Sequence, residues 1–138
     1  MKAITLWQPW ASLVVCGFKQ YETRSWTTGH RGTLAIHAAK RKPAPIGVTP
    51  EVTMAINTIL RIYGIRSMDD LPRGAILGTV DLVQDFRTEK MPAPDSLERQ
   101  LGDYSPGRFA WVLLHPQKYR DAIPARGYQR LWNWDEIR

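Results

Sequence analysis

Most apolar runs of this chain are short and lie too close together for a helix to cross between successive strands. A parallel βαβ unit needs a crossover of about a dozen residues, which this spacing rarely provides. The pattern therefore predicts an α+β fold, with the strands forming one small mixed barrel. Five or six strands are expected, at residues 3–7, 21–26, 33–38, 74–86 and 109–114, and in the tail 123–134.

Two segments have helical character. Residues 10–18 space their apolar side chains as a helix does, and Gly17 is suited to end it. A second helix is expected from residue 50 or 51 through 63, with Thr49 as its N-cap. Residues 40–50 contain three prolines and predict a loop. The polar stretch 89–106 has room for a short helix, so two or three helices are expected to flank the barrel.

The composition favours an acidic partner. Nineteen Lys and Arg side chains against 13 Asp and Glu give a net charge of +6, which attracts nucleic acid or another phosphate-bearing ligand. One cysteine excludes an internal disulfide and fits a cytoplasmic location. No signal peptide and no membrane span are predicted. The three histidines have no metal-ligand spacing, so we expect no metal and no cofactor.

The residues between Gly17 and Trp26 combine charge with aromatic side chains. If residues 21–26 are extended, Glu22, Arg24 and Trp26 share one face, and Lys19 enters from the preceding turn. A solvated charged strand face is the alternative interpretation. Lys19 itself is open to three roles: a ligand contact, a nucleophile, or a structural partner of the carboxylate.

Three motifs connect the chain to a known family. Leu-Trp-Gln-Pro-Trp lies at residues 6–10, Gly-x-Lys-x-x-Glu-x-Arg-Ser-Trp at 17–26, and His-Arg-Gly-x-Leu at 30–34. Together they resemble the ASCH domains of the PUA-like barrel superfamily, especially the version at the carboxyl end of a eukaryotic coactivator. The similarity covers nearly the whole chain apart from about residues 85–108, which predicts one ASCH domain over residues 1–138.

The resemblance implies a PUA-like β-barrel whose cleft holds the Lys, Glu and Arg of the motif. It further implies a partner that is RNA, single-stranded nucleic acid or a modified nucleoside. The leading hypothesis is a binding domain, and a protein-interaction domain is ranked last. A small hydrolase is the alternative, acting as a ribonuclease or as an N4-acylcytidine amidohydrolase with the motif lysine as nucleophile. In those amidohydrolases a threonine lies three residues after the lysine, where this chain has Glu22, and a distant glutamate completes the set, for which Glu89 is available.

The candidate site residues follow from the motifs and their neighbours. If the protein is an enzyme, Lys19 and Glu22 are the catalytic candidates. His37 is expected to be a hydrogen-bonded barrel histidine, and Lys40 belongs to a basic loop cluster. The expected ligand-binding residues are Gln8, Trp10, Lys19, Glu22, Arg24, Trp26, Arg31 and Lys40.

Overall fold

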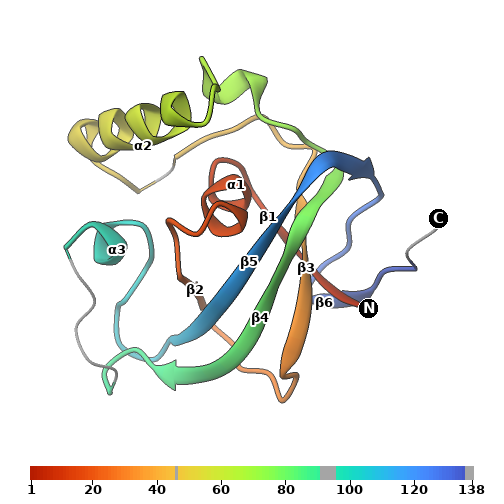
Figure 1. Cartoon of the computed structure of the whole chain (residues 1–138). Helices are drawn as coiled ribbons and strands as arrows, with labels where there is room; N and C mark the ends of the chain where they lie inside the picture. The colour runs from red at the N-terminus through yellow and green to blue at the C-terminus, as the bar shows by residue number, and fades with distance from the viewer. Residues whose placement is uncertain (46, 91–95, 136–138) are drawn as a thin grey trace.

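A computed structural model of the chain describes residues 1–45, 47–90 and 96–135 (Figure 1). The described part forms a six-stranded curled half barrel with three helices, which confirms the predicted α+β, PUA-like class. The strands are β1 (Lys2–Leu6), β2 (Tyr21–Arg24), β3 (Gly32–Ala38), β4 (Ala75–Arg87), β5 (Phe109–Pro124) and β6 (Leu131–Asn133). The helices are α1 (Trp10–Val15), α2 (Pro50–Ile62) and α3 (Ser96–Gln100), with a 3-10 turn at Met68–Asp70.

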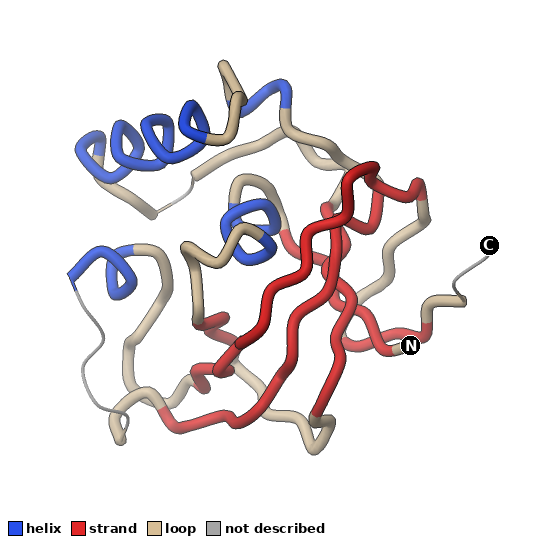
Figure 2. The backbone as a smooth tube through the Cα atoms, in the orientation of Figure 1, coloured by secondary structure: helices blue, strands red, loops and turns tan. Residues whose placement is uncertain are grey.

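The sheet has the order β2-β5-β4-β3-β1-β6. Only the pairing of β1 with β3 is parallel among the described strands, because α1 and β2 lie between them in the chain. The long strands β4 and β5 run side by side across the middle and bend with the sheet (Figure 2). Strands β2 and β6 are therefore the two ends of the sheet. An open seam lies between β2 and β1, the strand that pairs with β6.

Helix α1 fills the concave side of the curled sheet and packs against β1, β3, β4 and β5 (Figure 1). Its buried side chains and those of the inner sheet face make the core. All six side chains that their positions predict to be buried are at most 4% exposed, which confirms this core: Leu13, Ile36, Val80, Leu82, Trp111 and Leu113.

The outer helix α2 begins as its sequence predicts. The Thr49 hydroxyl accepts a hydrogen bond from the Val52 amide at 3.2 Å, and Pro50 occupies the first turn. Its apolar stripe joins Leu13 of α1 in a second buried cluster. No helix in the described part of the chain is long and apolar enough to span a membrane.

Three predicted boundaries are wrong. Strand β2 ends at Arg24 rather than at residue 26. Helix α1 ends at Val15 rather than near residue 18, although Gly17 closes it with a φ of 84° as expected. Strand β5 does not end at His115 but continues to Pro124. His115 adopts a left-handed φ of 53° beside a register shift, so it forms a bulge that lets the strand continue.

The predicted short helix in the 89–106 stretch is α3. Position 46 of the predicted loop and positions 91–95 of the polar stretch lie outside the described residues.

Candidate functional site

The motif residues form one connected ionic group at the sheet end β2. The two carboxylate oxygens of Glu22 are divided between two cations: Oε1 lies 3.4 Å from Lys19 Nζ, and Oε2 lies 3.1 Å from Arg24 Nη2. Lys19 Nζ also donates to the Tyr21 carbonyl. The side chain of Lys19 is only 2% exposed, so its positive charge is balanced inside the protein before any ligand arrives.

Arg24 connects the two sides of the open seam. Its Nη2 donates to the backbone carbonyl of Thr5 in β1 at 3.3 Å, and the same nitrogen lies 3.1 Å from Glu22 Oε2. Arg24 Nε is buried and has no hydrogen-bond partner among the described residues. The sequence prediction that Glu22 and Arg24 share one strand face therefore agrees with their geometry.

A glutamate distant in sequence fixes the turn that carries Lys19. The Glu98 carboxylate in α3 accepts hydrogen bonds from the backbone amides of Gln20 and Tyr21 at 3.0–3.2 Å. Glu98 is 6% exposed. Glu89, the glutamate available from sequence alone, instead accepts from the Gly107 amide and lies near Arg87. Sequence reasoning missed Glu98 because the groups that it holds in this turn are backbone amides, which leave no pattern of residue types.

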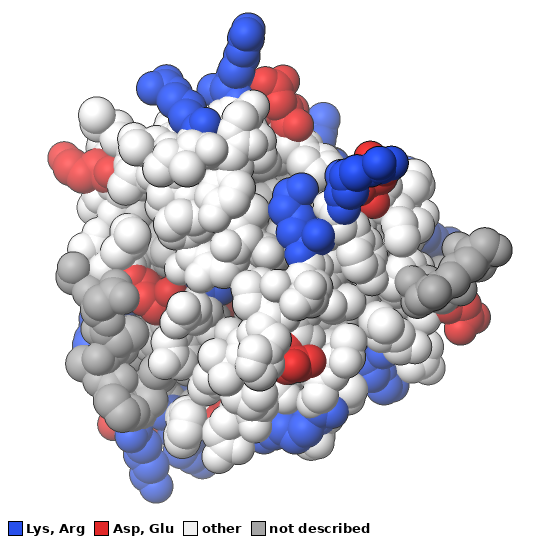
Figure 3. Space-filling model, viewed as in Figure 1, with Lys and Arg blue, Asp and Glu red and all other residues white. Residues whose placement is uncertain are grey.

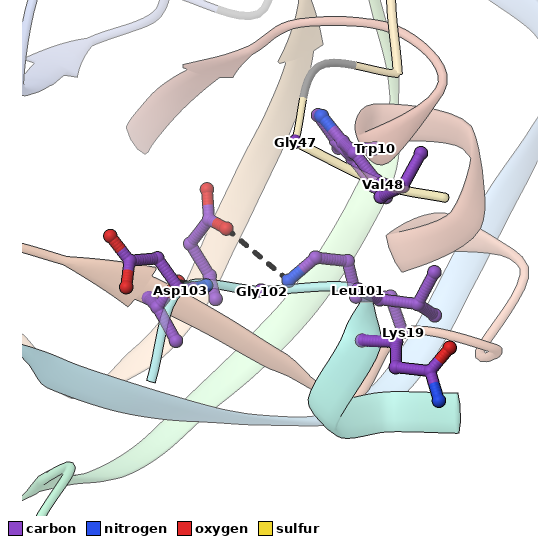
Figure 4. A pocket seen from close by; sticks show the side chains of 10 residues that line it. Trp10, Lys19, Gly47, Val48, Leu101, Gly102 and Asp103 are labelled. Atoms are coloured by element: carbon purple, nitrogen blue, oxygen red, sulfur yellow. Dashed lines mark hydrogen bonds and ion pairs between the residues drawn. The ribbon is translucent and has the colours of Figure 1, made fainter. Parts of the chain in front are cut away.

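The motif group opens into a cavity of about 460 Å³, which we call the motif cavity. Trp10 and Val48 stand on one wall and the 101–103 segment on another (Figure 4). Lys19 extends between them to its contact with Glu22. The Asp103 amide donates to the Thr23 hydroxyl at 3.0 Å, which holds that segment against β2. The cavity is lined by Trp10, Lys19, Glu22, Thr23, Gly47, Val48, Gln100, Leu101, Gly102 and Asp103.

Asp103 gives the motif cavity a second carboxylate. Hydrogen bonds from the hydroxyl and amide of Ser105, together with Arg108, hold the pKa of Asp103 below its usual range. Asp103 is therefore ionised at neutral pH. Two carboxylates and one ammonium line this cavity, and the carboxylate oxygens are acceptors for hydrogen-bond donors of a ligand.

The motif cavity continues into a groove along the open seam, which we call the seam groove. The two share Trp10, Glu22, Thr23 and Asp103, and the groove has a volume of about 690 Å³. Its walls add three arginines: Arg24, Arg108 and Arg130. The Arg130 guanidinium lies over the Trp26 ring, 4.6 Å from its centroid. The seam groove thus has more cations than carboxylates and contains several aromatic side chains.

A third hollow, of about 700 Å³, adjoins the far end of the seam groove. We call it the Tyr128 cavity, because Tyr128 lies where the two meet, together with Thr5 and Gln129. His37 lies under it and is 2% exposed. His37 Nε2 lies 2.7 Å from the Ala125 carbonyl, and its Nδ1 lies 3.1 Å from the Thr5 hydroxyl. The expectation of a hydrogen-bonded barrel histidine is confirmed.

The ligand-binding candidates from sequence lie in different places. Trp10 lines both the motif cavity and the seam groove, and Trp26 lines the seam groove. Lys40 lies in the Tyr128 cavity, away from the motif.

The other two candidates lie apart from these hollows. Gln8 is 0% exposed because its amide is used in the core, accepting from the Ser12 amide and donating to the Pro72 carbonyl. Arg31 is held on the surface by Asp85 at 2.8 Å.

Several groove residues had no signal in the sequence. Asp103, Arg108, Tyr128 and Arg130 lie far along the chain from the motif, and only the sheet order brings them to the seam. On the face viewed in Figure 3, lysine and arginine side chains are scattered rather than gathered in one patch. In the described ranges, no three His, Cys, Asp or Glu side chains are grouped to hold a metal ion.

Comparison with known proteins gives a consistent result. A family model described as the ASCH domain matches residues 4–122. Activating signal cointegrator 1 of Homo sapiens is 34% identical over 134 residues, and that of Mus musculus is 33% identical over the same length. Each alignment covers 96% of this chain but only 22% of the relative, so the chain spans about a fifth of the length of these relatives.

Solved structures show the same fold. The ASCH protein from Zymomonas mobilis matches with a TM-score of 0.54 at 15% identity, covering 98% of this chain and 87% of that one. A mutant of the same protein matches with a TM-score of 0.53 at 14% identity, covering 98% and 89%. At such low identity the likeness concerns the fold alone.

Proposed function

Since the chain belongs to the ASCH domain family, whose PUA-like fold is associated with RNA binding, we propose that it binds single-stranded nucleic acid along the open seam. In this proposal one base enters the motif cavity and the neighbouring phosphates follow the arginines of the seam groove. The observation that carries it is the opposite charge balance of these adjoining hollows. A nucleotide has two parts that match these hollows, because its base donates hydrogen bonds and its phosphate is an anion.

The motif cavity suits a base with an amino group. The carboxylates of Glu22 and Asp103 line it and accept hydrogen bonds only, as they would from the N4 amino group of cytosine. Trp10 supplies an aromatic wall for stacking. We therefore expect tighter binding of cytidine than of uridine, because uracil lacks an exocyclic amino group.

The motif geometry favours binding over hydrolysis. A nucleophilic lysine must direct its amino group at the substrate, but Lys19 Nζ already donates to the Tyr21 carbonyl and lies beside Glu22. Glu22 is in turn engaged by Arg24. In our proposal the motif is therefore a fixed ionic scaffold that shapes the base pocket.

The test measures binding and hydrolysis in parallel. Fluorescence anisotropy follows labelled cytidine and uridine hexanucleotides at about 50 and 200 mM salt, and chromatography follows hydrolysis of N4-acetylcytidine and of the RNA itself. We expect preference for the cytidine strand, an affinity that falls with salt, and no hydrolysis. Trp10→Ala is expected to weaken binding about 10-fold through lost stacking, whereas Tyr63→Ala, at an exposed position outside the motif cavity and the seam groove, leaves it unchanged.

The result that would replace this proposal is efficient hydrolysis by the wild-type protein. If Glu22→Gln then lowers the rate by ~10²–10⁴ while binding survives, the motif acts as an acid–base pair and the protein is a hydrolase. Because Glu22 also supports the fold, its variant is assayed at a temperature where circular dichroism shows it to be folded.

A further inference from the structure

The Tyr128 cavity differs from the motif cavity in that its cations have no counter-charges. Lys40 and Arg126 both line it, and no Asp or Glu is among its lining residues. Neither side chain has an ion-pair partner within the described ranges. Two uncompensated positive charges facing one hollow attract an anion, and a phosphate is the anion that a nucleic-acid strand would bring there.

An aromatic platform stands beside these cations. Tyr128 is 52% exposed, although its neighbours restrict the ring. The Arg126 guanidinium lies 5.1 Å from the Tyr128 ring centroid, and Trp132 meets the ring at 5.4 Å with an interplanar angle of 62°. An exposed ring whose orientation is already fixed stacks a base with little loss of side-chain entropy.

The loop that presents Arg126 and Tyr128 is fixed to the barrel. Its Ala125 carbonyl accepts from His37, and Gly127 lies so close to β1 and β3 that a Cβ there would be 2.5 Å from His37 Cε1 and 2.7 Å from Thr5 Oγ1. Only glycine allows this approach. The Lys40 stem lies against Gly74 in the same way, at 3.0 Å from where a Cβ would be.

The cavity is continuous with the proposed binding groove. Thr5, Tyr128 and Gln129 line both it and the seam groove, and the seam groove in turn shares four residues with the motif cavity. A strand whose base enters the motif cavity therefore has a continuous path along the seam to the Tyr128 cavity. The far end of that path offers the two groups that a nucleotide needs, a cation for its phosphate and a ring for its base.

We propose that the Tyr128 cavity is a second nucleotide subsite, in which Lys40 and Arg126 bind a phosphate and Tyr128 stacks a base of the strand held by the motif cavity. This rests on the proposed function and narrows its ligand to a single-stranded oligonucleotide rather than a free nucleoside. The motif cavity selects the base, and the Tyr128 cavity adds affinity that depends on strand length.

The experiment measures how affinity depends on length for cytidine strands, from the mononucleotide to strands of about eight nucleotides. It compares the wild-type protein with the double variant Arg126→Ala, Tyr128→Ala. The matched control is Arg66→Ala, Tyr63→Ala, which removes the same two residue types from exposed positions outside the three hollows. RNA and DNA strands of equal length are compared, because both carry the phosphates and bases that the subsite would bind.

The expected result is a wild-type affinity that rises with length and a double variant that loses at least about 10-fold on the longest strands while binding mononucleotide as wild type does. The control variant retains the rise. A wild-type affinity independent of length, a double variant that keeps the rise, or a duplex preferred over the single strand would overturn the subsite and leave base binding by the motif cavity intact. No binding of any nucleotide or strand at low salt would overturn the proposed function as well.

Discussion

The motif cavity and the Tyr128 cavity lie at opposite ends of one seam groove but use their charges differently. In the motif cavity Lys19 is 2% exposed and its charge is balanced by Glu22, so the cation mainly shapes the pocket. In the Tyr128 cavity Lys40 and Arg126 face the hollow with no carboxylate among its lining residues. Charge in a sequence motif therefore does not by itself indicate where an anion binds. Lys19, the lysine of the motif, is buried and already paired with Glu22.

The largest expected effect is on folding, from Glu22→Gln. Removing this carboxylate leaves the buried Lys19 ammonium with the Tyr21 carbonyl but no counter-charge, so the free energy of unfolding should fall by about 3 kcal/mol. Urea unfolding at pH 7 measures it. The control is Asp121→Asn, whose pair with Arg120 is 76% and 94% exposed, with an expected change within ~0.5 kcal/mol. A Glu22→Gln effect as small as the control's would show that the motif is not a pre-balanced scaffold.

The ion pair in the motif cavity could largely be predicted from sequence, because it depends on local periodicity. Alternation in residues 21–26 places Glu22 and Arg24 on one strand face, and their ion pair follows. Gln8 has the opposite outcome. It belongs to the same family pattern but is 0% exposed, because it supports α1 rather than a ligand.

The Tyr128 end could not be predicted, because its parts meet only through the sheet order. Arg126 and Tyr128 reach Lys40 since β6 pairs with β1 and the preceding loop folds back over β3. No local pattern encodes that approach. The continuation of β5 beyond His115 was missed for a related reason, since a left-handed residue at a bulge resembles the end of a strand in sequence.

The second prediction concerns pH and His37, which lies under the Tyr128 cavity. Burial lowers the pKa of His37, and only the hydrogen bond to Ala125 opposes this. The Ala125 carbonyl can only accept, so His37 is neutral with its proton on Nε2.

Below pH ~6.5 the unfolded chain takes up a proton at His37 that the folded chain refuses, so stability is lost as the pH falls towards the lowered folded pKa. The slope should reach up to about 1.4 kcal/mol per pH unit and vanish above pH ~7. Thermal or urea unfolding between about pH 5 and 7.5 measures it. His37→Gln should flatten the slope, whereas His30→Gln should not. A wild-type slope that His37→Gln leaves unchanged would contradict the prediction.

The third prediction concerns Arg130, which stands between the two cavities. Its φ of 58° is left-handed, which is unfavourable by about 1–2 kcal/mol for a residue with a Cβ. Arg130→Gly and Arg130→Ala both lose the contact with Trp26, but only glycine relieves the backbone. The glycine variant should therefore be more stable than the alanine variant by about 1 kcal/mol. At Arg108, which lacks a positive φ, alanine should be at least as stable as glycine.

The smallest expected effect tests the charge comparison directly, through the salt dependence of binding. A cation that neutralises a phosphate releases counterions, and each such contact on a single strand adds about 0.7 to the slope of log affinity against log salt. Lys40→Met should therefore reduce the magnitude of the slope for a cytidine octanucleotide by about 0.7. Lys19→Met should leave the slope unchanged even if it alters affinity, because the Lys19 ammonium is already neutralised by Glu22 and is shielded from the strand.

Anisotropy titrations at four salt concentrations give each slope, with Arg66→Met as the control for a cation outside the groove. An equal loss of slope in both lysine variants would show that Lys19 reaches a phosphate, and the two cavities would then be parts of one phosphate-binding surface.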